Sequence, residues 1–335
     1  MGDAAALVDD VLSQYPLAGC SLGVVTRDGL TDSVVRGIAA DDRAVELDTV
    51  FRIGSVTKTM TALALLRQWE AGRFDLDDPV NDHLEELELV GRPGWRAPTI
   101  RHLLTHTAGI GELSSWSDLR RPMFGLAIPV DQPPANAARR YGGRLRLDVE
   151  PGTKWAYANH GFNVLGHVLE TMSAEPYAER MRSVLFEPLG MDHTDVVRSD
   201  RVVRHLATGY VNRRRGLHSP KDTDIELQAA GSVFSTLPDM AAYAAALLDG
   251  GRGVVKPETL ALAFEPHYRP CATHPGIGLS FFRGDLDGRI TVGHAGGVPG
   301  FVTAFALAPD DGVGVVAFTN GGGQAVSIAA HRVLC

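Results

Sequence analysis

The spacing of hydrophobic residues along the chain predicts a series of short helices and strands. Apolar residues recur at the interval of an amphipathic helix over residues 4–15. Two apolar runs, 22–25 and 34–38, flank the turn signal Asp28-Gly29 and predict an antiparallel hairpin. Residues 55–71 again carry apolar residues at helical spacing, which predicts a second helix.

The middle of the chain is predicted to be mostly helical. Thr99 precedes a short helix that Gly109 ends, and a stretch rich in glycine and proline runs from 109 to 152. Two further helices are expected over 160–173 and 176–186.

The last third of the chain returns to strands. Thr236 to Asp239 resembles a capping box, with aspartate in place of glutamate, and predicts the start of a helix that runs to Leu248. Short strand-like runs follow, and a helix is expected near the end; the runs cover 277–282, 290–292, 302–307 and 313–318, and the helix covers 322–334.

Together these elements predict an α+β fold. The simplest packing joins the N- and C-terminal strands in one antiparallel sheet flanked by helices, with the middle as a mostly helical insertion. We expect residues 1–60 and 230–335 to form the sheet domain and residues 61–229 the helical domain. Because clefts between such regions are favoured binding sites, we expect the active site between them.

Composition and charge narrow the function classes. Of 335 residues, 44% are hydrophobic and 21% charged, as in ordinary globular proteins. A net charge of −8 argues against a nucleic-acid partner, because phosphate binding needs a basic face. The odd count of three cysteines does not suggest a disulfide framework. With no apolar run of ~18 residues and no visible signal peptide, we expect a cytoplasmic protein without a membrane span; a secreted mature form is the alternative.

The candidate chemistry begins at Ser55-Val56-Thr57-Lys58, at the start of the second expected helix. A three-residue step on a helix places Ser55 and Lys58 side by side, and a neighbouring amine can take the proton of a serine hydroxyl. The helix N-terminus adds positive partial charge where an oxyanion would form. The alternative is that Ser55 caps the helix and Lys58 lies at the surface.

The second candidate element is Tyr157-Ala158-Asn159, just before an expected helix. Tyrosine can act as a base if its pKa of ~10 falls by about 3 units, which takes about 4 kcal/mol of differential stabilisation. A nearby lysine cation can supply part of that energy. Asn159 can donate to a substrate carbonyl and bridge to the lysine. The alternative is a core tyrosine and a turn asparagine.

The third candidate element is His294-Ala295-Gly296-Gly297, at the end of a strand-like run. Glycines at this place let a substrate lie against the strand edge, and a backbone N–H group can point at an oxyanion. The alternative is a glycine-rich turn with a surface histidine.

In this order the three elements resemble the motifs S-x-x-K, Y-x-N and [K/H]-x-G of the penicillin-recognising serine hydrolases. That superfamily includes class C β-lactamases, D-alanyl-D-alanine carboxypeptidases and lactamase-like esterases. The resemblance covers about residues 5–330 and extends to flanking stretches, which are 51–54, 76–80, 100–109, 185–191 and 299–301. It implies the β-lactamase/transpeptidase-like fold.

The resemblance also implies a role for each motif residue. Ser55 would be the nucleophile, and Lys58 and Tyr157 would share the general-base and general-acid work. Backbone N–H groups of Ser55 and Gly297 would form the oxyanion hole. The substrate-binding and oxyanion positions together would be Asn159, His294, Gly296 and Gly297.

The third motif departs from the Lys-Thr-Gly of β-lactamases, because His294 replaces the lysine and Ala295 the threonine. In those enzymes both side chains help to bind a substrate carboxylate, so strong β-lactam hydrolysis is not expected. A histidine fits the peptidase and esterase branches, and the missing hydroxyl favours esterase or amide-releasing activity.

We therefore expect a cofactor-free serine hydrolase that forms an acyl-enzyme on Ser55 and acts on a small ester, an amide or a D-amino-acid peptide. Two alternatives stay open. An acyltransferase or peptide cyclase would use the same acyl-serine with an amine or alcohol in place of water. A non-catalytic sensor or scaffold would have no need of the intact Ser55, Lys58, Tyr157 and Asn159.

His102 and His106 stand four residues apart on an expected helix, as zinc ligands can. The zincin pattern needs glutamate after the first histidine, and Leu103 stands there. We expect structural roles for both histidines and no metal site.

Overall fold

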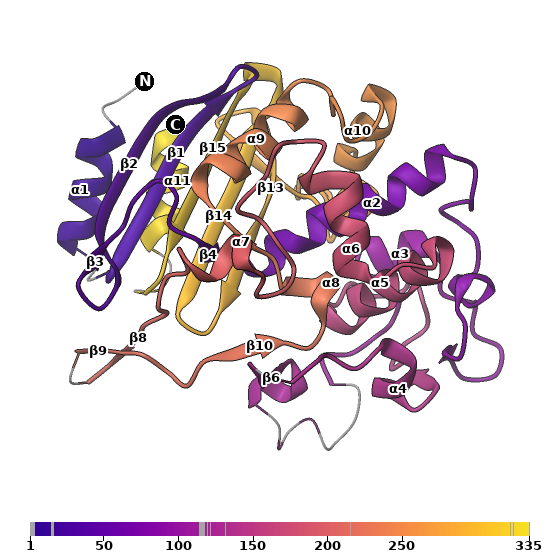
Figure 1. The fold of residues 1–335 in the computed structure, drawn as a ribbon. Coiled ribbons are helices and arrows are strands. Elements are labelled where there is room, and N and C mark those ends of the chain that lie inside the picture. Colours follow the sequence, from indigo (N-terminus) through magenta and orange to yellow (C-terminus); the bar gives the residue numbers. More distant parts are fainter. Residues whose placement is uncertain are drawn as a thin grey trace.

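The chain folds around a seven-stranded antiparallel sheet (Figure 1). The computed structural model describes residues 4–14, 17–113, 118, 120, 122–130, 132–214, 216–321, 323 and 325–334. In sheet order the strands are β12 (Phe282–Leu286), β13 (Arg289–Val298), β14 (Phe301–Ala308), β15 (Val313–Thr319), β1 (Gly19–Thr26), β2 (Gly29–Ala40) and β3 (Arg43–Ala44). N- and C-terminal segments therefore meet in one sheet, where β1 pairs with β15.

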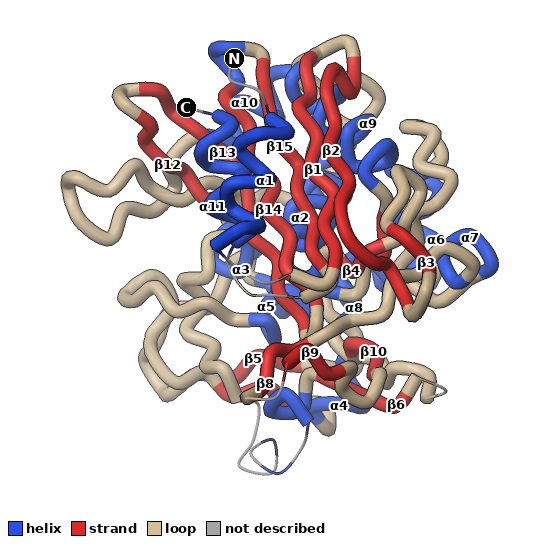
Figure 2. Tube along the Cα trace, turned by 90° about the vertical axis from the view of Figure 1, so that its left-hand side faces the viewer, coloured by secondary structure: helices blue, strands red, loops and turns tan. Residues whose placement is uncertain are grey.

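Helices cover both faces of this sheet. On one face α1 (Ala4–Gln14) and α11 (Ala325–Leu334) pack together, and they lie in front of the strands in Figure 2. On the other face α9 (Leu237–Leu248) packs against β1, β2 and β15. Because the sheet is covered on both sides, β1 shows a continuous run of buried residues rather than an alternating pattern.

The remaining elements are mostly short and lie beside the sheet. The helices are α2 (Thr57–Glu70), α3 (Ile100–Leu104), α4 (Ala137–Tyr141), α5 (Asn159–Ser173), α6 (Tyr177–Met181), α7 (Asp200–Val203), α8 (Gln228–Gly231) and α10 (Pro257–Phe264). The strands form four pairs, which are β4 (Phe51–Arg52) with β11 (Phe234–Ser235), β5 (Glu88–Val90) with β7 (Arg144–Arg146), β6 (Ala127–Pro129) with β10 (Thr223–Ile225), and β8 (Val211–Arg213) with β9 (Gly216–His218).

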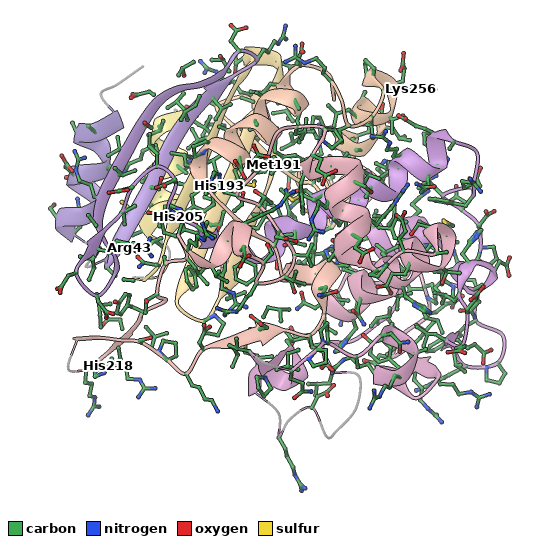
Figure 3. The ribbon with its side chains drawn as sticks, viewed as in Figure 1. Arg43, Met191, His193, His205, His218 and Lys256 are labelled. Atoms are coloured by element: carbon green, nitrogen blue, oxygen red, sulfur yellow. The ribbon has the colours of Figure 1, made fainter. Side chains whose placement is uncertain are left out.

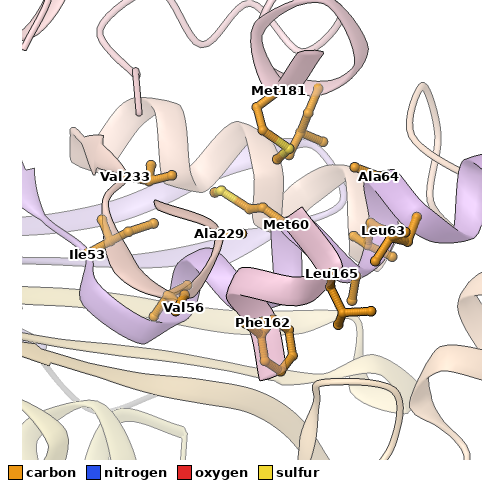
Figure 4. Close-up of a cluster of buried hydrophobic side chains, with 14 of the residues drawn as sticks. Ile53, Val56, Met60, Leu63, Ala64, Phe162, Leu165, Met181, Ala229 and Val233 are labelled. Carbon is orange, nitrogen blue, oxygen red and sulfur yellow. The ribbon is translucent and has the colours of Figure 1, made fainter. Parts of the chain in front are cut away.

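The central helix α2 is buried on all sides from Thr57 to Leu66. Its apolar residues pack against α5, α6 and α8 in the cluster drawn in Figure 4. Its buried threonines have partners: the Thr59 hydroxyl donates to Val56 O at 2.8 Å, and the Thr61 hydroxyl donates to Ala229 O at 2.8 Å. Since these polar groups are satisfied, the helix can sit inside the core and hold the residues before it in a fixed place.

One continuous hydrophobic core runs from the sheet through α2 into the neighbouring helices. It includes Phe318 on β15, Met60 on α2 and Leu165 on α5. The core therefore crosses the predicted boundaries near residues 60 and 230, and the division into two domains stays a prediction.

Most of the expected elements are present with shifted ends, but the strand expected over 277–282 is wrong. Ser280 adopts a left-handed φ of +71°, and β12 begins only at Phe282. The helix expected over 176–186 ends as a π-helix from Arg182. Residues 15, 322 and 324 of the first and last expected helices lie outside the described residues.

The capping box predicted at Thr236 is half present. Thr236 Oγ1 accepts a hydrogen bond from the Asp239 N–H group at 3.3 Å and caps α9. The second half of the box is not formed, and the Asp239 carboxylate accepts hydrogen bonds from the His193 N–H group and the Thr194 hydroxyl. In the described part of the chain, the helices are all too short or too polar to cross a membrane.

Candidate active site

Ser55 lies in a single 3₁₀ turn, Gly54–Val56, directly before α2. Its hydroxyl does not cap the helix: the N-cap of α2 is Val56, which makes no side-chain hydrogen bond. Instead Ser55 Oγ lies 3.1 Å from Lys58 Nζ. The alternative of Ser55 as a helix cap is therefore wrong, and its hydroxyl is free of the backbone for chemistry.

Lys58 is fully buried, whereas the other three lysines of the chain are exposed, as Lys256 is in Figure 3. Its Nζ lies 2.8 Å from Asn159 Oδ1 and 2.7 Å from Ala230 O. Among the described residues no carboxylate forms an ion pair with it. Burial lowers the pKa of Lys58 well below the ordinary lysine value, because a charged amine loses its hydration there. The alternative of a surface lysine is wrong.

Tyr157 lies just before α5, and its ring faces Lys58. The ring centroid is 4.9 Å from Lys58 Nζ and 4.4 Å from the ring centroid of His106. Burial raises the pKa of Tyr157 above its ordinary value, and a hydrogen bond with Ser55 opposes that rise. The pKa of Tyr157 is thus shifted away from the lowered value that a base would need, because the site buries the phenol.

His294 lies within β13 rather than at its end, and it is 5% exposed. Its Nδ1 atom lies 2.5 Å from Ala295 O. Burial and the nearby Lys58 lower the pKa of His294 to about 3, so the imidazole is neutral at pH 7. The alternative of a surface histidine is wrong, and this position does not supply the cation that a lysine would supply in the third motif.

The two glycines of the third motif lie where β13 passes the Ser55 turn. A Cβ atom on Gly296 would lie 1.9 Å from Ile53 O and 3.3 Å from Ser55 N, so only glycine fits there. A Cβ atom on Gly297 would have no neighbour within 4 Å. On the turn, Gly54 adopts a φ of +53°, and a Cβ atom there would lie 2.7 Å from Gly297 N. The backbone N atoms of Ser55 and Gly297 thus both lie where β13 passes close to the Ser55 turn.

A small pocket of about 50 Å³ opens beside Ser55. The described residues that line it carry no charge: besides Ser55 and Asn159 they are glycine, alanine and larger apolar residues, which are Met123, Leu126, Ile225, Leu227 and Val298. Sequence reasoning missed these wall residues, because they come from distant segments and form no motif.

The two histidines with zinc-like spacing have separate structural partners. His102 closes a capping box at the start of α3, where its Nδ1 accepts from the Thr99 N–H group and its own N–H group donates to Thr99 Oγ1, both at 3.2 Å. The turn after α3 holds His106 against Tyr157. Within the described ranges, no group of three or more histidine, cysteine, aspartate or glutamate side chains could hold a metal ion.

Comparison with known proteins finds relatives of this chain among penicillin-binding proteins and esterases. The chain is 28% identical to the putative penicillin-binding protein PbpX of Bacillus subtilis over 60% of its own length and 47% of that protein's. It is 32% identical to the esterase EstB of Burkholderia gladioli over 56% and 49% of the two lengths. Each match thus spans about half the length of the curated relative.

A solved structure shows the same fold over nearly the whole chain. The octameric penicillin-binding protein homologue from Pyrococcus abyssi superposes with a TM-score of 0.84 at 24% identity, covering 99% of this chain and 76% of that one. The model of the family described as Beta-lactamase matches residues 4–334. The chain belongs to the beta-lactamase family.

Proposed function

We propose that this protein is a serine hydrolase that forms an acyl-enzyme on Ser55. One observation carries the proposal: the Ser55 hydroxyl lies 3.1 Å from the amine of a fully buried lysine. Burial lowers the pKa of this amine and so favours its neutral, basic form, and a base beside a hydroxyl is the arrangement that activates serine as a nucleophile.

In the structure Lys58 Nζ donates to Ser55 Oγ, Asn159 Oδ1 and Ala230 O, and the base in this proposal is the neutral form of the amine. Such an amine has two N–H donors and one lone pair. Asn159 Oδ1 and Ala230 O are both acceptors, and they take the two donors. The lone pair is then left for the Ser55 proton. In acylation, Oγ attacks the substrate carbonyl carbon while its proton passes to Nζ.

Tyr157 fits the role of general acid. Because its pKa is raised, the phenol keeps its proton at neutral pH, and its place beside Ser55 brings that proton near the bond that breaks. As the ester or amide bond breaks, the leaving oxygen or nitrogen takes the phenol proton, and the Lys58 ammonium can return a proton to the phenolate. Water then attacks the acyl group, and Oγ recovers its proton.

Backbone N–H groups would stabilise the tetrahedral intermediate. The close passage of Gly296 along the Ser55 turn supports the N–H groups of Ser55 and Gly297 as the oxyanion hole. Ser55 directly precedes α2, so the positive end of that helix adds to the stabilisation. Asn159, which bonds Lys58 through Oδ1, has its amide N–H groups left to orient a substrate carbonyl.

The substrate class that fits best is a small uncharged ester or amide. The pocket beside Ser55 is apolar, and both His294 and Lys58 favour their neutral forms. The name of the relative EstB supports an ester. The net charge of −8 supports a small molecule rather than a nucleic acid. Ala295 and the neutral His294 argue against efficient β-lactam hydrolysis.

The apolar pocket predicts a strong preference for neutral acyl groups. We expect kcat/KM for p-nitrophenyl butyrate to exceed that for mono-p-nitrophenyl succinate by about 10²- to 10³-fold, because the pocket would bury the second carboxylate without a partner. Steady-state kinetics of wild type and Met123→Lys check this. The lysine should lower the ratio of kcat/KM for the butyrate ester to kcat/KM for the succinate ester, and Met123→Leu should leave that ratio unchanged. Equal kcat/KM values for the two esters in wild type would contradict an uncharged pocket.

The experiment that tests the function compares wild type with Ser55→Ala. The proteins are incubated with p-nitrophenyl butyrate, with nitrocefin and with a fluorophosphonate, and intact masses are measured. We expect ester turnover and one adduct in wild type, and neither in the variant. Equal rates for both proteins with no adduct would overturn the enzyme assignment and favour a non-catalytic binder. Product esters formed with added alcohols would favour the acyltransferase alternative.

A further inference from the structure

His106 contacts the segment that carries Tyr157 at three points. Its backbone oxygen accepts a hydrogen bond from the Ala156 N–H group at 2.9 Å, and its Nδ1 atom accepts one from the Ala158 N–H group at 3.1 Å. Between these two bonds the imidazole lies against the phenol of Tyr157, with 4.4 Å between ring centroids and 31° between ring planes. One residue thus holds both neighbours of Tyr157 and the ring itself.

The backbone of His106 is held in an unusual conformation to make these contacts. Its φ is +59°, in the left-handed region that residues other than glycine rarely adopt. The turn around it is fixed by hydrogen bonds from the His106 N–H group to Leu103 O at 3.2 Å and from the Thr107 N–H group to His102 O at 2.8 Å. Strained conformations of this kind persist where the surroundings over-determine them, and they gather at functional sites.

The hydrogen bond to Nδ1 also fixes the chemical form of the ring. Because Nδ1 accepts a hydrogen bond from the Ala158 N–H group, it carries no proton itself, so His106 is neutral with its proton on Nε2. The ring is 3% exposed, and burial, with Lys58 and His294 nearby, lowers the pKa of His106 well below the ordinary value. The acceptor is therefore present across the working pH range.

From this geometry we propose that His106 is a positioning residue that sets the place of the Tyr157 phenol beside Ser55 and Lys58. The inference deepens the proposed function and rests on it, since the place of the phenol matters to the reaction only if Tyr157 transfers a proton. The hydrogen bonds of His106 to this segment go to backbone N–H groups and its ring packs on the phenol ring, so it acts through Tyr157. The sequence suggested only structural roles for His102 and His106. It did not indicate the contact of His106 with Tyr157, because Tyr157 lies some fifty residues later in the chain.

The test compares His106→Phe with His106→Asn. Phenylalanine keeps a ring against Tyr157 but removes the acceptor for the Ala158 N–H group. Asparagine offers a carbonyl acceptor and tolerates the left-handed φ. We expect the Phe variant to lose about 10- to 100-fold in kcat for p-nitrophenyl butyrate with KM nearly unchanged, and the Asn variant to recover most of the loss. A control is His267→Phe, since His267 is half-buried and bonds Leu262 O and Arg101 instead.

A second measurement follows Tyr157 directly. Tyrosine labelled with ¹³C at Cζ gives a signal that Tyr157→Phe assigns, and its titration reports the surroundings of the phenol. In wild type and the Asn variant we expect the pKa of the Tyr157 phenol to lie above the ordinary tyrosine value. In the Phe variant we expect that pKa to return toward ~10. A folded Phe variant with unchanged kcat and an unchanged Tyr157 signal would overturn the proposal.

The two measurements separate this proposal from the proposed function. If wild type shows no turnover that depends on Ser55, the hydrolase assignment fails, and the Tyr157 signal alone decides whether His106 holds the phenol. If the Phe variant does not fold, the Asn variant decides: a stable Asn variant whose Tyr157 titrates near its ordinary value would overturn the positioning role, and a signal like that of wild type would support it.

Discussion

Replacing Lys58 with methionine is expected to lower kcat/KM for p-nitrophenyl butyrate by about 10²- to 10⁴-fold, the usual contribution of a positioned general base. The reason is that Nζ lies 3.1 Å from Ser55 Oγ, whereas the raised pKa of the neighbouring Tyr157 phenol keeps that group protonated. Methionine has similar volume and suits the apolar surroundings, so the loss should appear with the fold intact. Steady-state kinetics and the rate of fluorophosphonate labelling measure it.

Lys58→Arg separates a base from a positive charge. Arginine keeps its proton at any working pH, so it cannot accept the proton of Ser55. If Lys58 acts as a neutral base, the Arg variant should be as inactive as the Met variant. A general base contributes at least about 100-fold, so an Arg variant that keeps more than about a tenth of wild-type activity would show that Lys58 acts through its charge instead.

The same variants predict a pH dependence of stability. In the unfolded chain Lys58 has an ordinary pKa near 10.4, and in the folded protein burial lowers it. Between the two values the unfolded state binds more protons, so the free energy of unfolding rises with pH, by about 1.4 kcal/mol per unit for one proton. When urea unfolding is measured from pH 7 to 9, the free energy of unfolding of wild type should rise more steeply with pH than that of Lys58→Met. Equal slopes would mean that folded Lys58 stays protonated, against the assignment of a neutral base.

The sequence predicts the local part of the site and misses the part that depends on folding. Ser55 and Lys58 are three residues apart on a helix, so their contact follows from the helix itself. Tyr157 and His294 join them only through the fold, and only the family resemblance indicates that they do. The direction of the Tyr157 pKa shift could not be predicted, because it depends on burial, which arises from packing.

The fold shows the same division. Strands β14 and β15 match apolar runs because both contribute to a buried sheet. Helix α2 looks amphipathic in sequence, yet residues 57–66 are buried on all sides, because Thr59 and Thr61 find hydrogen-bond partners that sequence does not reveal. The apolar run at 277–281 is buried without being a strand, since the left-handed Ser280 interrupts it.

Replacing Gly296 with alanine is expected to destabilise the protein by about 1–3 kcal/mol, the usual cost of overpacking. We also expect ester turnover to fall by about 10²-fold. The new Cβ atom would lie 1.9 Å from Ile53 O, where real Cβ atoms essentially never come closer than 3.0 Å, and the clash is with backbone. Either β13 or the Ser55 turn must therefore move, and both carry parts of the site. Urea unfolding and steady-state kinetics measure the two effects.

The neighbouring Gly297→Ala variant is the matched control for this clash. Its Cβ atom would have no neighbour within 4 Å, and Gly297 does not adopt a left-handed φ, so we expect its stability to stay within about 0.5 kcal/mol of wild type. Equal stability for the two alanine variants would show that β13 does not pass as close to the Ser55 turn as the Gly296 contact requires. A stable, fully active Gly296→Ala variant would contradict the proposed oxyanion hole, because the tetrahedral intermediate needs both N–H groups within hydrogen-bond reach of one oxygen.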